Sequence, residues 1–238
     1  MNYCLYCDRP FLQKVSWASV LTFQREELLC TTCVQKLKGI NGSLCGVCGR
    51  PLEQISEKFQ RDGYCLDCVA WGESEKWSHV LKSNHSLFLY NSFLKDVIAK
   101  YKFRGDAELA KLFIPGIQKL YNTYHKKTIV TYIPLSKERE YERGFNQSHL
   151  IASHLPNCTA LLIRNTNEQK QSKKSKKERL LLENGHFSLD KTIEKLVKDA
   201  DITIVDDIYT TGSTVRQAAK ILRDHGARTV CSITIARG

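Results

Sequence analysis

The stretch ITIVDDIYTTGST, residues 202–214, decides the fold of the C-terminal part of this 238-residue chain. Its apolar and β-branched start predicts a buried strand that runs up to Asp206 and Asp207. A cluster of Thr, Gly and Ser follows, and helical periodicity then continues to about Ala227, with Gly226 as the expected stop. A strand, a hydroxyl-rich turn and a helix in this order predict a phosphate-binding loop, because backbone N–H groups and the positive end of the helix point at the same place.

The two aspartates are too negative to hold a phosphate themselves. Carboxylates accept hydrogen bonds from a diol, so their position fits the hydroxyls of a sugar that also carries a phosphate. A Walker-B-like magnesium site is one alternative, but the chain contains no G-x-x-x-x-G-K-[ST] motif, which argues against a P-loop nucleotide triphosphatase. A purely structural helix cap is another, although four hydroxyls around one glycine exceed what capping requires. The stretch therefore predicts a site for a sugar 5-phosphate.

Alternating strand-like and helix-like segments surround this stretch from about residue 79 onward. Strands are expected at residues 86–91, 128–135, 160–163, 201–205 and 229–236, and helices at 93–103, 107–121, 146–155 and 214–227. This order predicts an α/β domain with a mainly parallel sheet flanked by helices. Ligands of such sheets bind beyond the carboxyl ends of the strands, where we expect both residues 202–214 and IPLSKEREYERGFNQ, residues 133–147.

Eight of the ten cysteines lie near the start of the chain as four C-x-x-C pairs, Cys4/Cys7, Cys30/Cys33, Cys45/Cys48 and Cys65/Cys68. This spacing lets two thiolates reach one tetrahedral ion, so eight ligands make two closed zinc sites. The segments that separate the pairs of sequential sites, residues 8–29 and 49–64, are close to ribbon-type spacing and favour consecutive zinc ribbons over an interleaved arrangement. Disulfides and redox dithiols are disfavoured, because the chain start does not resemble a secretory signal and no βαβ pattern surrounds the pairs. Cys158 and Cys231 are expected in the core.

The net charge of +11 belongs to the C-terminal part, because residues 1–75 hold eight Lys or Arg against nine Asp or Glu. A basic surface favours phosphate-bearing partners such as nucleic acid or phosphorylated metabolites. An ordinary hydrophobic fraction of 42% and the lack of a long apolar stretch favour a soluble protein. We expect the protein in the cytoplasm, with peripheral association at the inner face of the membrane as a second location.

The run EQKQSKKSKKER, residues 168–179, holds six Lys or Arg and no apolar residue, which predicts an exposed, mobile loop. A solvated surface, a cover for a bound phosphate ligand and a grip on a nucleic-acid backbone are all compatible with it. The candidate DNA contacts in this run are Lys173, Lys174, Lys176, Lys177 and Arg179. Tyr132, Tyr141 and Phe145 are candidates for base stacking, although core packing is the commoner fate of such rings.

ITIVDDIYTTGST also matches, at every position, the phosphoribosyl pyrophosphate (PRPP) signature of type I phosphoribosyltransferases. Three further matches follow the cysteine pairs, namely KYKFRGD (100–106), IPLSKEREYERGFNQS (133–148) and a run of spaced matches over 163–187. Together these motifs resemble the ComF family of phosphoribosyltransferase-like competence proteins, over nearly the whole chain. The resemblance implies a double zinc-ribbon module at residues 1–75 and a type I phosphoribosyltransferase-like domain at residues 76–238.

Carried over to this chain, the resemblance implies that Asp206 and Asp207 face the ribose hydroxyls of PRPP, which binds with Mg²⁺. The loop for the 5-phosphate would consist of Thr210, Thr211, Gly212, Ser213 and Thr214. The pyrophosphate would be bordered by Lys137, Arg139 and Arg143. An exposed surface position without ligand contact accounts equally well for Lys137 and Arg139, whereas Arg143 lies in the matched RGFNQ.

The function that the resemblance implies is that of a late competence protein in DNA uptake and natural transformation, binding PRPP and single-stranded DNA. Other DNA-uptake or recombination proteins are the expected protein partners. Two alternatives stay open, namely an active phosphoribosyltransferase with an unknown acceptor and a sensory PRPP site without turnover. The residues alone identify no acceptor and no catalytic side chain.

Overall fold

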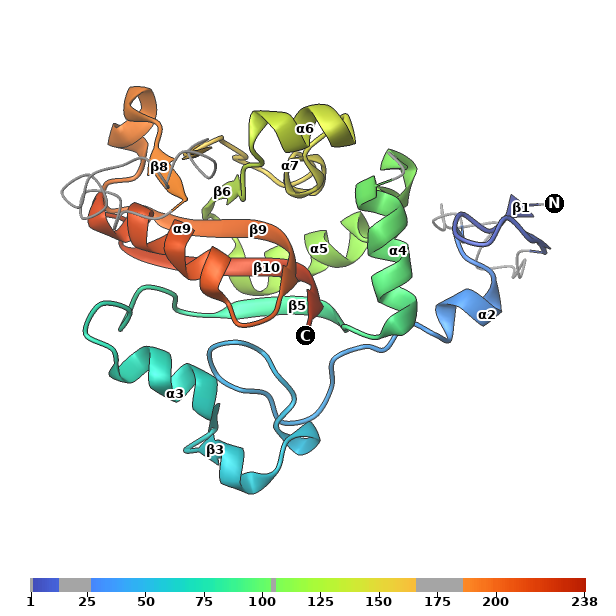
Figure 1. The fold of residues 1–238 in the computed structure, drawn as a ribbon, viewed down its shortest axis with the longest axis horizontal. Helices are drawn as coiled ribbons and strands as arrows, with labels where there is room; N and C mark the ends of the chain where they lie inside the picture. The colour runs from blue at the N-terminus through green and yellow to red at the C-terminus, as the bar shows by residue number, and fades with distance from the viewer. Residues whose placement is uncertain (1, 13–26, 104–105, 166–185) are drawn as a thin grey trace, which may run out of the picture.

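The computed structural model describes residues 2–12, 27–103, 106–165 and 186–238 (Figure 1). Its centre is a four-stranded parallel sheet in the order β5 (Asn84–Leu89), β10 (Thr229–Arg237), β9 (Asp201–Tyr209) and β6 (Ile129–Tyr132). The two central strands are buried over most of their length, which explains why their sequences are almost continuously apolar or β-branched. The predicted α/β class with a parallel sheet is confirmed.

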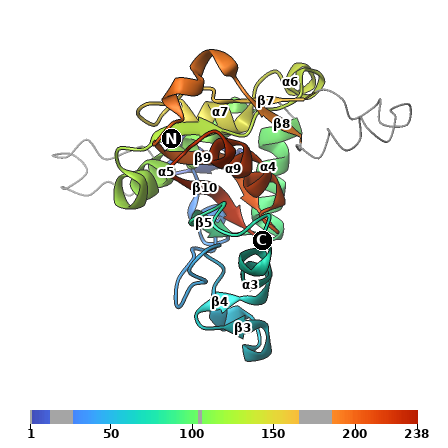
Figure 2. The ribbon, with the colours of Figure 1, turned by 90° about the vertical axis from the view of Figure 1, so that its left-hand side faces the viewer.

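Helices cover both faces of the sheet (Figures 1 and 2). On one face, α9 (Ser213–Asp224) buries Val215, Ala218, Ala219 and Leu222, the i, i+3, i+4, i+7 spacing of an amphipathic helix. The opposite face is covered by α4 (Ser92–Phe103), α5 (Ile114–Leu120) and α7 (Gln147–Ala152). Each face has its own hydrophobic cluster, so the C-terminal part has three layers.

The structure differs from the expected single helix at residues 107–121. A 3₁₀ segment, η3 (Ala107–Leu112), is followed by α5 and then by a π-helical turn, η4 (Tyr121–His125). Pro115 lies in the first turn of α5. Proline has no N–H to donate to the preceding turn, so the chain ends one helical segment and begins another there.

The strand expected at residues 160–163 lies outside the main sheet. It is β7 (Leu162–Arg164), which pairs antiparallel with β8 (Phe187–Leu189). The β7–β8 pair packs near α9. The last strand expected from the sequence, at residues 229–236, does lie in the main sheet, as β10. A short 3₁₀ segment, η6 (Lys191–Leu196), follows β8.

Strand β9 continues beyond its expected end at residue 205. Its pairing with β10 extends to Tyr209, which lies opposite Arg237, so Asp206 and Asp207 are strand residues. The stop expected after α9 is confirmed, because Gly226 has a left-handed φ of 91° directly after the last turn.

The cysteine pairs lie in two small units that are separated in space (Figures 1 and 2). The first unit contains β1 (Asn2–Tyr3), β2 (Pro10–Phe11) and α2 (Thr31–Val34). The second contains η1 (Leu52–Gln54), η2 (Glu57–Phe59), β3 (Gln60–Arg61), β4 (Tyr64–Cys65) and α3 (Leu66–Glu73). The first packs on the cluster around α4 and the second on the cluster around α9, and the Val47 carbonyl of the second unit accepts from the Asn84 N–H of the edge strand β5 at 2.7 Å.

Among the residues that the structure describes, no helix has the length and apolar character needed to cross a membrane.

Candidate functional site

Two clusters of four cysteines form the candidate metal centres. One joins Cys4, Cys7, Cys30 and Cys33, and the other joins Cys45, Cys48, Cys65 and Cys68. Within each cluster all four Sγ atoms lie within 4.8 Å of one another. The predicted sequential pairing is confirmed, because each cluster combines two consecutive C-x-x-C motifs.

The sulfur distances fit a tetrahedral metal and not a disulfide. Cys7 Sγ lies 3.8 Å from Cys30 Sγ, and Cys48 Sγ lies 3.6 Å from Cys65 Sγ. Four thiolates about 2.3 Å from one zinc ion lie about 3.8 Å apart, whereas disulfide sulfurs lie about 2 Å apart. The described cysteines are all free, and the donor set of four sulfurs is the one that closed structural zinc sites use.

The local backbone explains how each motif presents its sulfurs. In the second unit the Cys45 N–H donates to the Arg50 carbonyl and the Gly49 N–H donates to the Cys45 carbonyl, which closes a tight turn around the first motif. Gly49 has a φ of 68°, which glycine adopts at low cost. The second motif opens α3, with Cys65 at its N-cap. One turn and one helix start therefore point four sulfurs at one place.

The candidate ligand site lies at the carboxyl ends of β9 and β6, as predicted. Asp206 is buried, and its Oδ1 accepts hydrogen bonds from Ser148 Oγ at 3.2 Å and from the Asp207 N–H at 2.9 Å. Burial, together with the neighbouring charge of Asp207, raises the pKa of Asp206 to about 7. A carboxyl group near its pKa at neutral pH can accept or donate a hydrogen bond, which suits contact with sugar hydroxyls.

Asp207 is held by a cation from the other side of the site. Its carboxylate forms an ion pair with Lys102 Nζ from the end of α4, and both side chains are largely buried. Arg143 also lies within electrostatic reach of Asp207, and its Nη1 donates to Gln147 Oε1 at 2.9 Å. The site thus combines two carboxylates with two cations, an arrangement that can hold both hydroxyls and phosphate oxygens.

The loop between β9 and α9 has the form expected of an anion cradle. Gly212 adopts a φ of 80°, and a Cβ placed there would lie 2.2 Å from Tyr209 Oη, so only glycine fits. Thr210 and Thr211 are exposed, and their N–H groups, like that of Gly212, donate to no acceptor in the described part of the chain. Ser213 begins α9, and its N–H contacts Thr211 Oγ1 at 3.3 Å. Free N–H groups before a 12-residue helix are an arrangement that can bind an anion.

The three cations predicted beside the pyrophosphate lie on α6 (Lys137–Arg143). This helix begins at Ser136, whose Oγ accepts the Arg139 N–H, and it ends at Gly144 with a φ of 76°. Lys137 and Arg139 are exposed, whereas Arg143 is half-buried and faces the site. The structure therefore separates Arg143 from the other two, in agreement with its place in the RGFNQ motif.

The predicted nucleic-acid contacts are only partly described. Residues 168–179, with their five candidate cations, lie outside the described residues. Of the candidate stacking rings, Tyr132 packs against His149 at 4.5 Å and Phe145 packs against Tyr101 at 5.5 Å. Tyr141 is 90% exposed on α6, so it is the one of these three rings that is open to a base.

The two unpaired cysteines lie at the edge of the core. Cys158 and Cys231 are half-buried, and burial raises the pKa of the Cys158 thiol. Neither lies in the candidate ligand site. A raised thiol pKa argues against a nucleophile, so Cys158 is a packing residue.

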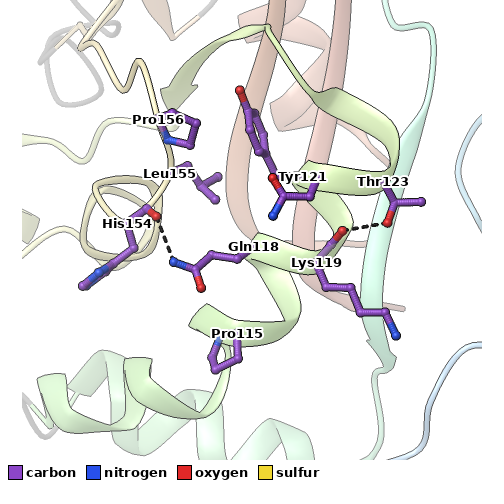
Figure 3. A pocket seen from close by; sticks show the side chains of 9 residues that line it. Pro115, Gln118, Lys119, Tyr121, Thr123, His154, Leu155 and Pro156 are labelled. Atoms are coloured by element: carbon purple, nitrogen blue, oxygen red, sulfur yellow. Dashed lines mark hydrogen bonds between the residues drawn. The ribbon is translucent and has the colours of Figure 1, made fainter. Parts of the chain in front are cut away.

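A cavity of about 680 Å³ lies between α5 and the segment after α7, away from the carboxyl ends of the strands (Figure 3). Gln118 Nε2 donates to the His154 carbonyl across it at 3.1 Å. Its lining includes Pro115, Lys119 and Leu155 but none of the predicted site residues. The chemistry predicted from the sequence is therefore not in this cavity.

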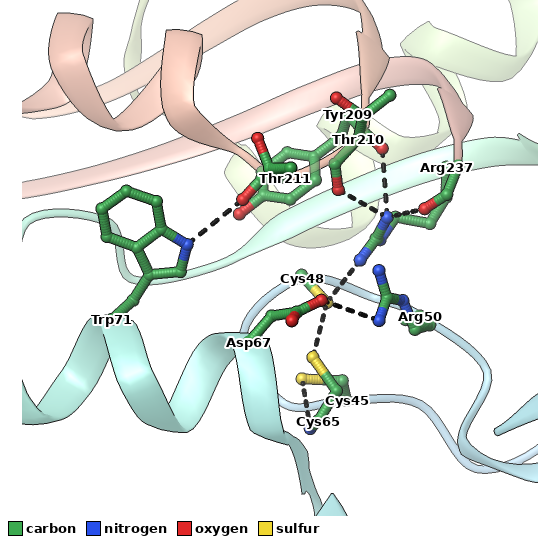
Figure 4. A network of polar contacts seen from close by, with 11 residues as sticks. Cys45, Cys48, Arg50, Cys65, Asp67, Trp71, Tyr209, Thr210, Thr211 and Arg237 are labelled. Atoms are coloured by element: carbon green, nitrogen blue, oxygen red, sulfur yellow. Dashed lines mark hydrogen bonds and ion pairs between the residues drawn. The ribbon is translucent and has the colours of Figure 1, made fainter. Parts of the chain in front are cut away.

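Several side chains at the site were not assigned a role from the sequence. Lys102 and Ser148 lie within KYKFRGD and IPLSKEREYERGFNQS, so motif membership was the signal that could have identified them. Trp71 and Arg237 contact the loop from distant parts of the chain, and no local pattern marks them (Figure 4). They join the site only through the tertiary structure.

Comparison with known families agrees with both parts of the chain. The model of the phosphoribosyl transferase domain matches residues 142–238, and the model of the double zinc ribbon domain matches residues 2–69. The chain therefore contains a phosphoribosyltransferase-like domain and a double zinc ribbon.

Curated relatives match along almost the whole chain. Competence protein ComFC of Bacillus subtilis is 38% identical over 237 residues, which cover 98% of this chain and 94% of the relative. Competence protein ComFC of Streptococcus pneumoniae is 30% identical over 236 residues, covering 98% and 99%. The DNA utilization protein YhgH of Salmonella typhimurium is 28% identical over 217 residues, covering 85% and 87%.

Proposed function

Because this chain belongs to the ComFC family of competence proteins, we propose that it acts in DNA uptake by binding PRPP and single-stranded DNA. The observation that carries the PRPP proposal is the pair Asp206 and Asp207 beside a loop whose N–H groups at residues 210–212 have no acceptor among the described residues. The carboxylates suit ribose hydroxyls, and the loop suits the 5-phosphate. One ligand with both groups, a ribose 5-phosphate that carries a diphosphate, satisfies the whole site.

The cations beside the aspartates support the diphosphate part of this proposal. Lys102 and Arg143 lie around Asp207, and α6 adds Lys137 and Arg139 at the rim. These charges offset the negative charge of a diphosphate. Asp207 also offers oxygen atoms of the kind that Mg²⁺ prefers, and Mg²⁺ would neutralise the diphosphate when it is bound.

Single-stranded DNA binding is supported by the charge and by one open aromatic ring. The chain carries a net charge of +11, and the exposed Tyr141 lies on α6, which carries Lys137, Arg139 and Arg143 together with three glutamates. A basic surface contacts the phosphate backbone, and an exposed ring stacks on a base without regard to sequence. We propose that α6 and the basic run at residues 168–179 share the DNA contacts.

Binding measurements test the PRPP proposal directly. Titration calorimetry with PRPP and Mg²⁺ should give a clear binding isotherm for the wild type and none for the double variant Asp206→Ala/Asp207→Ala. Asp224→Asn is a matched control, because this carboxylate is exposed at the far end of α9, where it pairs with Lys220. Unchanged PRPP binding by the double variant would contradict the assignment of the loop.

A second experiment tests the DNA proposal and the enzymatic alternative. Affinity for a labelled oligo-dT should fall steeply with salt, and it should fall further when Lys173 and Lys174 are changed to glutamine. Lys191→Gln/Lys195→Gln is the control, since these exposed lysines lie on η6. Equal losses in both variants would remove the run 168–179 from the DNA contacts. Release of pyrophosphate from PRPP with an acceptor would favour an active phosphoribosyltransferase.

A further inference from the structure

The side chain of Arg237 connects the second cysteine cluster with the phosphate loop (Figure 4). It is buried, with only 3% of its surface exposed. Its Nη2 lies 3.1 Å from Cys48 Sγ, and its Nη1 donates to the carbonyls of Tyr209 at 3.2 Å and Thr210 at 2.9 Å. One guanidinium thus contacts a metal ligand and the backbone where β9 passes into the loop.

Trp71 makes a second connection between the same two parts of the molecule (Figure 4). Its Nε1 donates to the Thr211 carbonyl at 3.2 Å. It lies on α3, the helix that has Cys65 at its N-cap and carries Cys68, so its position depends on the cluster. Arg216 of α9 stacks over its indole at 5.0 Å, which fixes the ring from the other side.

Together these contacts hold three successive carbonyls on the side of the second cysteine unit. The carbonyls belong to Tyr209, Thr210 and Thr211. When the carbonyls of a turn accept hydrogen bonds on one side, the N–H groups of that turn stay available for an anion on the other side. The N–H groups of residues 210–212 donate to no acceptor in the described part of the chain. The ring of Tyr209, which lies under Gly212 and 5.1 Å from the Arg237 guanidinium, supports the same turn from below.

The first cysteine unit contacts different elements. Lys100 Nζ of α4 donates to the Tyr6 carbonyl at 2.7 Å, and Asn91 Nδ2 donates to the Lys36 carbonyl at 2.8 Å. Tyr6 also packs on Phe93. In the described part of the chain, no hydrogen bond joins this unit to residues 209–214. The two metal centres therefore have different neighbours, and among the described contacts only the second reaches the loop.

We propose that the metal in the second zinc ribbon sets the shape of the phosphate loop, with Arg237 and Trp71 as positioning residues; this rests on the proposed function. Four thiolates around a divalent metal keep a net negative charge, to which a guanidinium donates a strong hydrogen bond. Without the metal the unit loses the shape that the metal imposes. Arg237 and Trp71 then lose their fixed positions, and the loop carbonyls are released.

Thermodynamic linkage gives this proposal a reciprocal consequence. If the metal favours the binding-competent loop, a ligand on the loop must favour retention of that metal by the same factor. Ribose 5-phosphate should therefore lower the amount of zinc that a chelator removes at equilibrium from one of the two clusters and leave the other unchanged. This readout follows the metal and does not depend on turnover.

The test compares Arg237→Met with Arg50→Met. Both arginines lie near the thiolates of the second cluster, but Arg50 pairs with Asp67 at 2.9 Å and does not contact the loop. With zinc content first shown to equal that of the wild type, Arg237→Met should weaken ribose 5-phosphate binding about tenfold or more, the loss expected for one hydrogen bond to a charged group. Arg50→Met should bind like the wild type.

A second pair of variants isolates the indole contact. Trp71→Phe removes the N–H donor with little change of shape, and Trp77→Phe is its control, because Trp77 packs edge-on against Trp71 at 5.4 Å without reaching the loop. Trp71→Phe should weaken ligand binding, and in Arg237→Met the ligand should no longer lower the amount of zinc that the chelator removes. Wild-type affinity in both Arg237→Met and Trp71→Phe, with zinc release independent of ligand, would overturn the proposal.

Amide hydrogen exchange separates this proposal from the proposed function. Without any ligand, the N–H groups of residues 210–214 should exchange faster in Arg237→Met and in Cys48→Ser than in the wild type. Cys7→Ser, which removes a ligand of the first cluster, should leave them unchanged. If the wild type bound no ribose 5-phosphate, the proposed function would fail, while faster exchange would still support the coupling. Unchanged exchange in both variants would reject the coupling itself.

Discussion

Replacement of Asp206 by asparagine should stabilise the ligand-free protein while it weakens ligand binding. Asp206 is 9% exposed, and burial together with Asp207 raises its pKa to about 7, against an ordinary value of about 3.9. Between these two pKa values the folded protein holds a proton that the unfolded chain has lost. The free energy of unfolding of the wild type therefore falls as the pH rises through this window.

The size of the effect follows from the raised pKa. One pH unit well inside the window changes the free energy of unfolding by about 1.4 kcal/mol, and less close to the folded pKa, so the change from pH 5 to pH 7 is about 2 kcal/mol. An asparagine has no charge to titrate, and its Oδ1 can still accept from Ser148 Oγ and the Asp207 N–H. The advantage of Asp206→Asn over the wild type should accordingly grow by about 2 kcal/mol between pH 5 and pH 7 and then level off.

Urea unfolding at pH 5, 6, 7 and 8, with zinc in slight excess, measures this difference. Other groups that titrate in the same range do so in both proteins, so they cancel when the two free energies are subtracted. Asp224→Asn should run parallel to the wild type, because its carboxylate is exposed in a surface ion pair. Parallel pH curves for Asp206→Asn and the wild type would refute the reasoning, since they would mean that Asp206 is ionised throughout.

Three further substitutions test other parts of the structure. Gly212→Ala should lower the melting temperature more than Gly144→Ala and abolish phosphate binding, because both glycines have a left-handed φ but only Gly212 of the two lacks room for a Cβ. Lys102→Met should cost about 3 kcal/mol at pH 8 by leaving a buried carboxylate unpaired, whereas Lys111→Met, in an exposed pair, should cost under about 1 kcal/mol in urea unfolding. Burial lowers the pKa of His125 to about 3, so its contribution to stability is complete above pH 6.5 and is lost by about 2 kcal/mol as the pH falls to 5. His125→Asn should flatten that part of the pH profile, and an unchanged slope would contradict it.

Much of the candidate site could be predicted from the sequence because its parts are local. The order strand, turn, helix in residues 202–214 fixes where the loop lies, and the left-handed turn at Gly212 requires glycine. The spacing of the cysteines likewise predicted two sequential clusters. The prediction of one continuous helix at residues 107–121 was wrong, because a new helical segment, α5, begins with Pro115 in its first turn. Apolar periodicity continues through such a break and does not reveal it.

The amino-acid sequence by itself determined most of the elements, the two cysteine clusters and the local form of the loop, since each depends on residues that are near one another in the chain. Only the tertiary structure decided what surrounds the loop. Trp71 meets Thr211 across 140 residues, and Arg237 meets Cys48 across 189 residues. Such contacts arise from the packing of the second zinc ribbon against α9 and the β5 edge of the sheet, and periodicity encodes the burial of a residue but not its distant partner. The loop could be predicted from one short stretch of sequence, whereas its contacts with the second cysteine cluster are seen only in the folded chain.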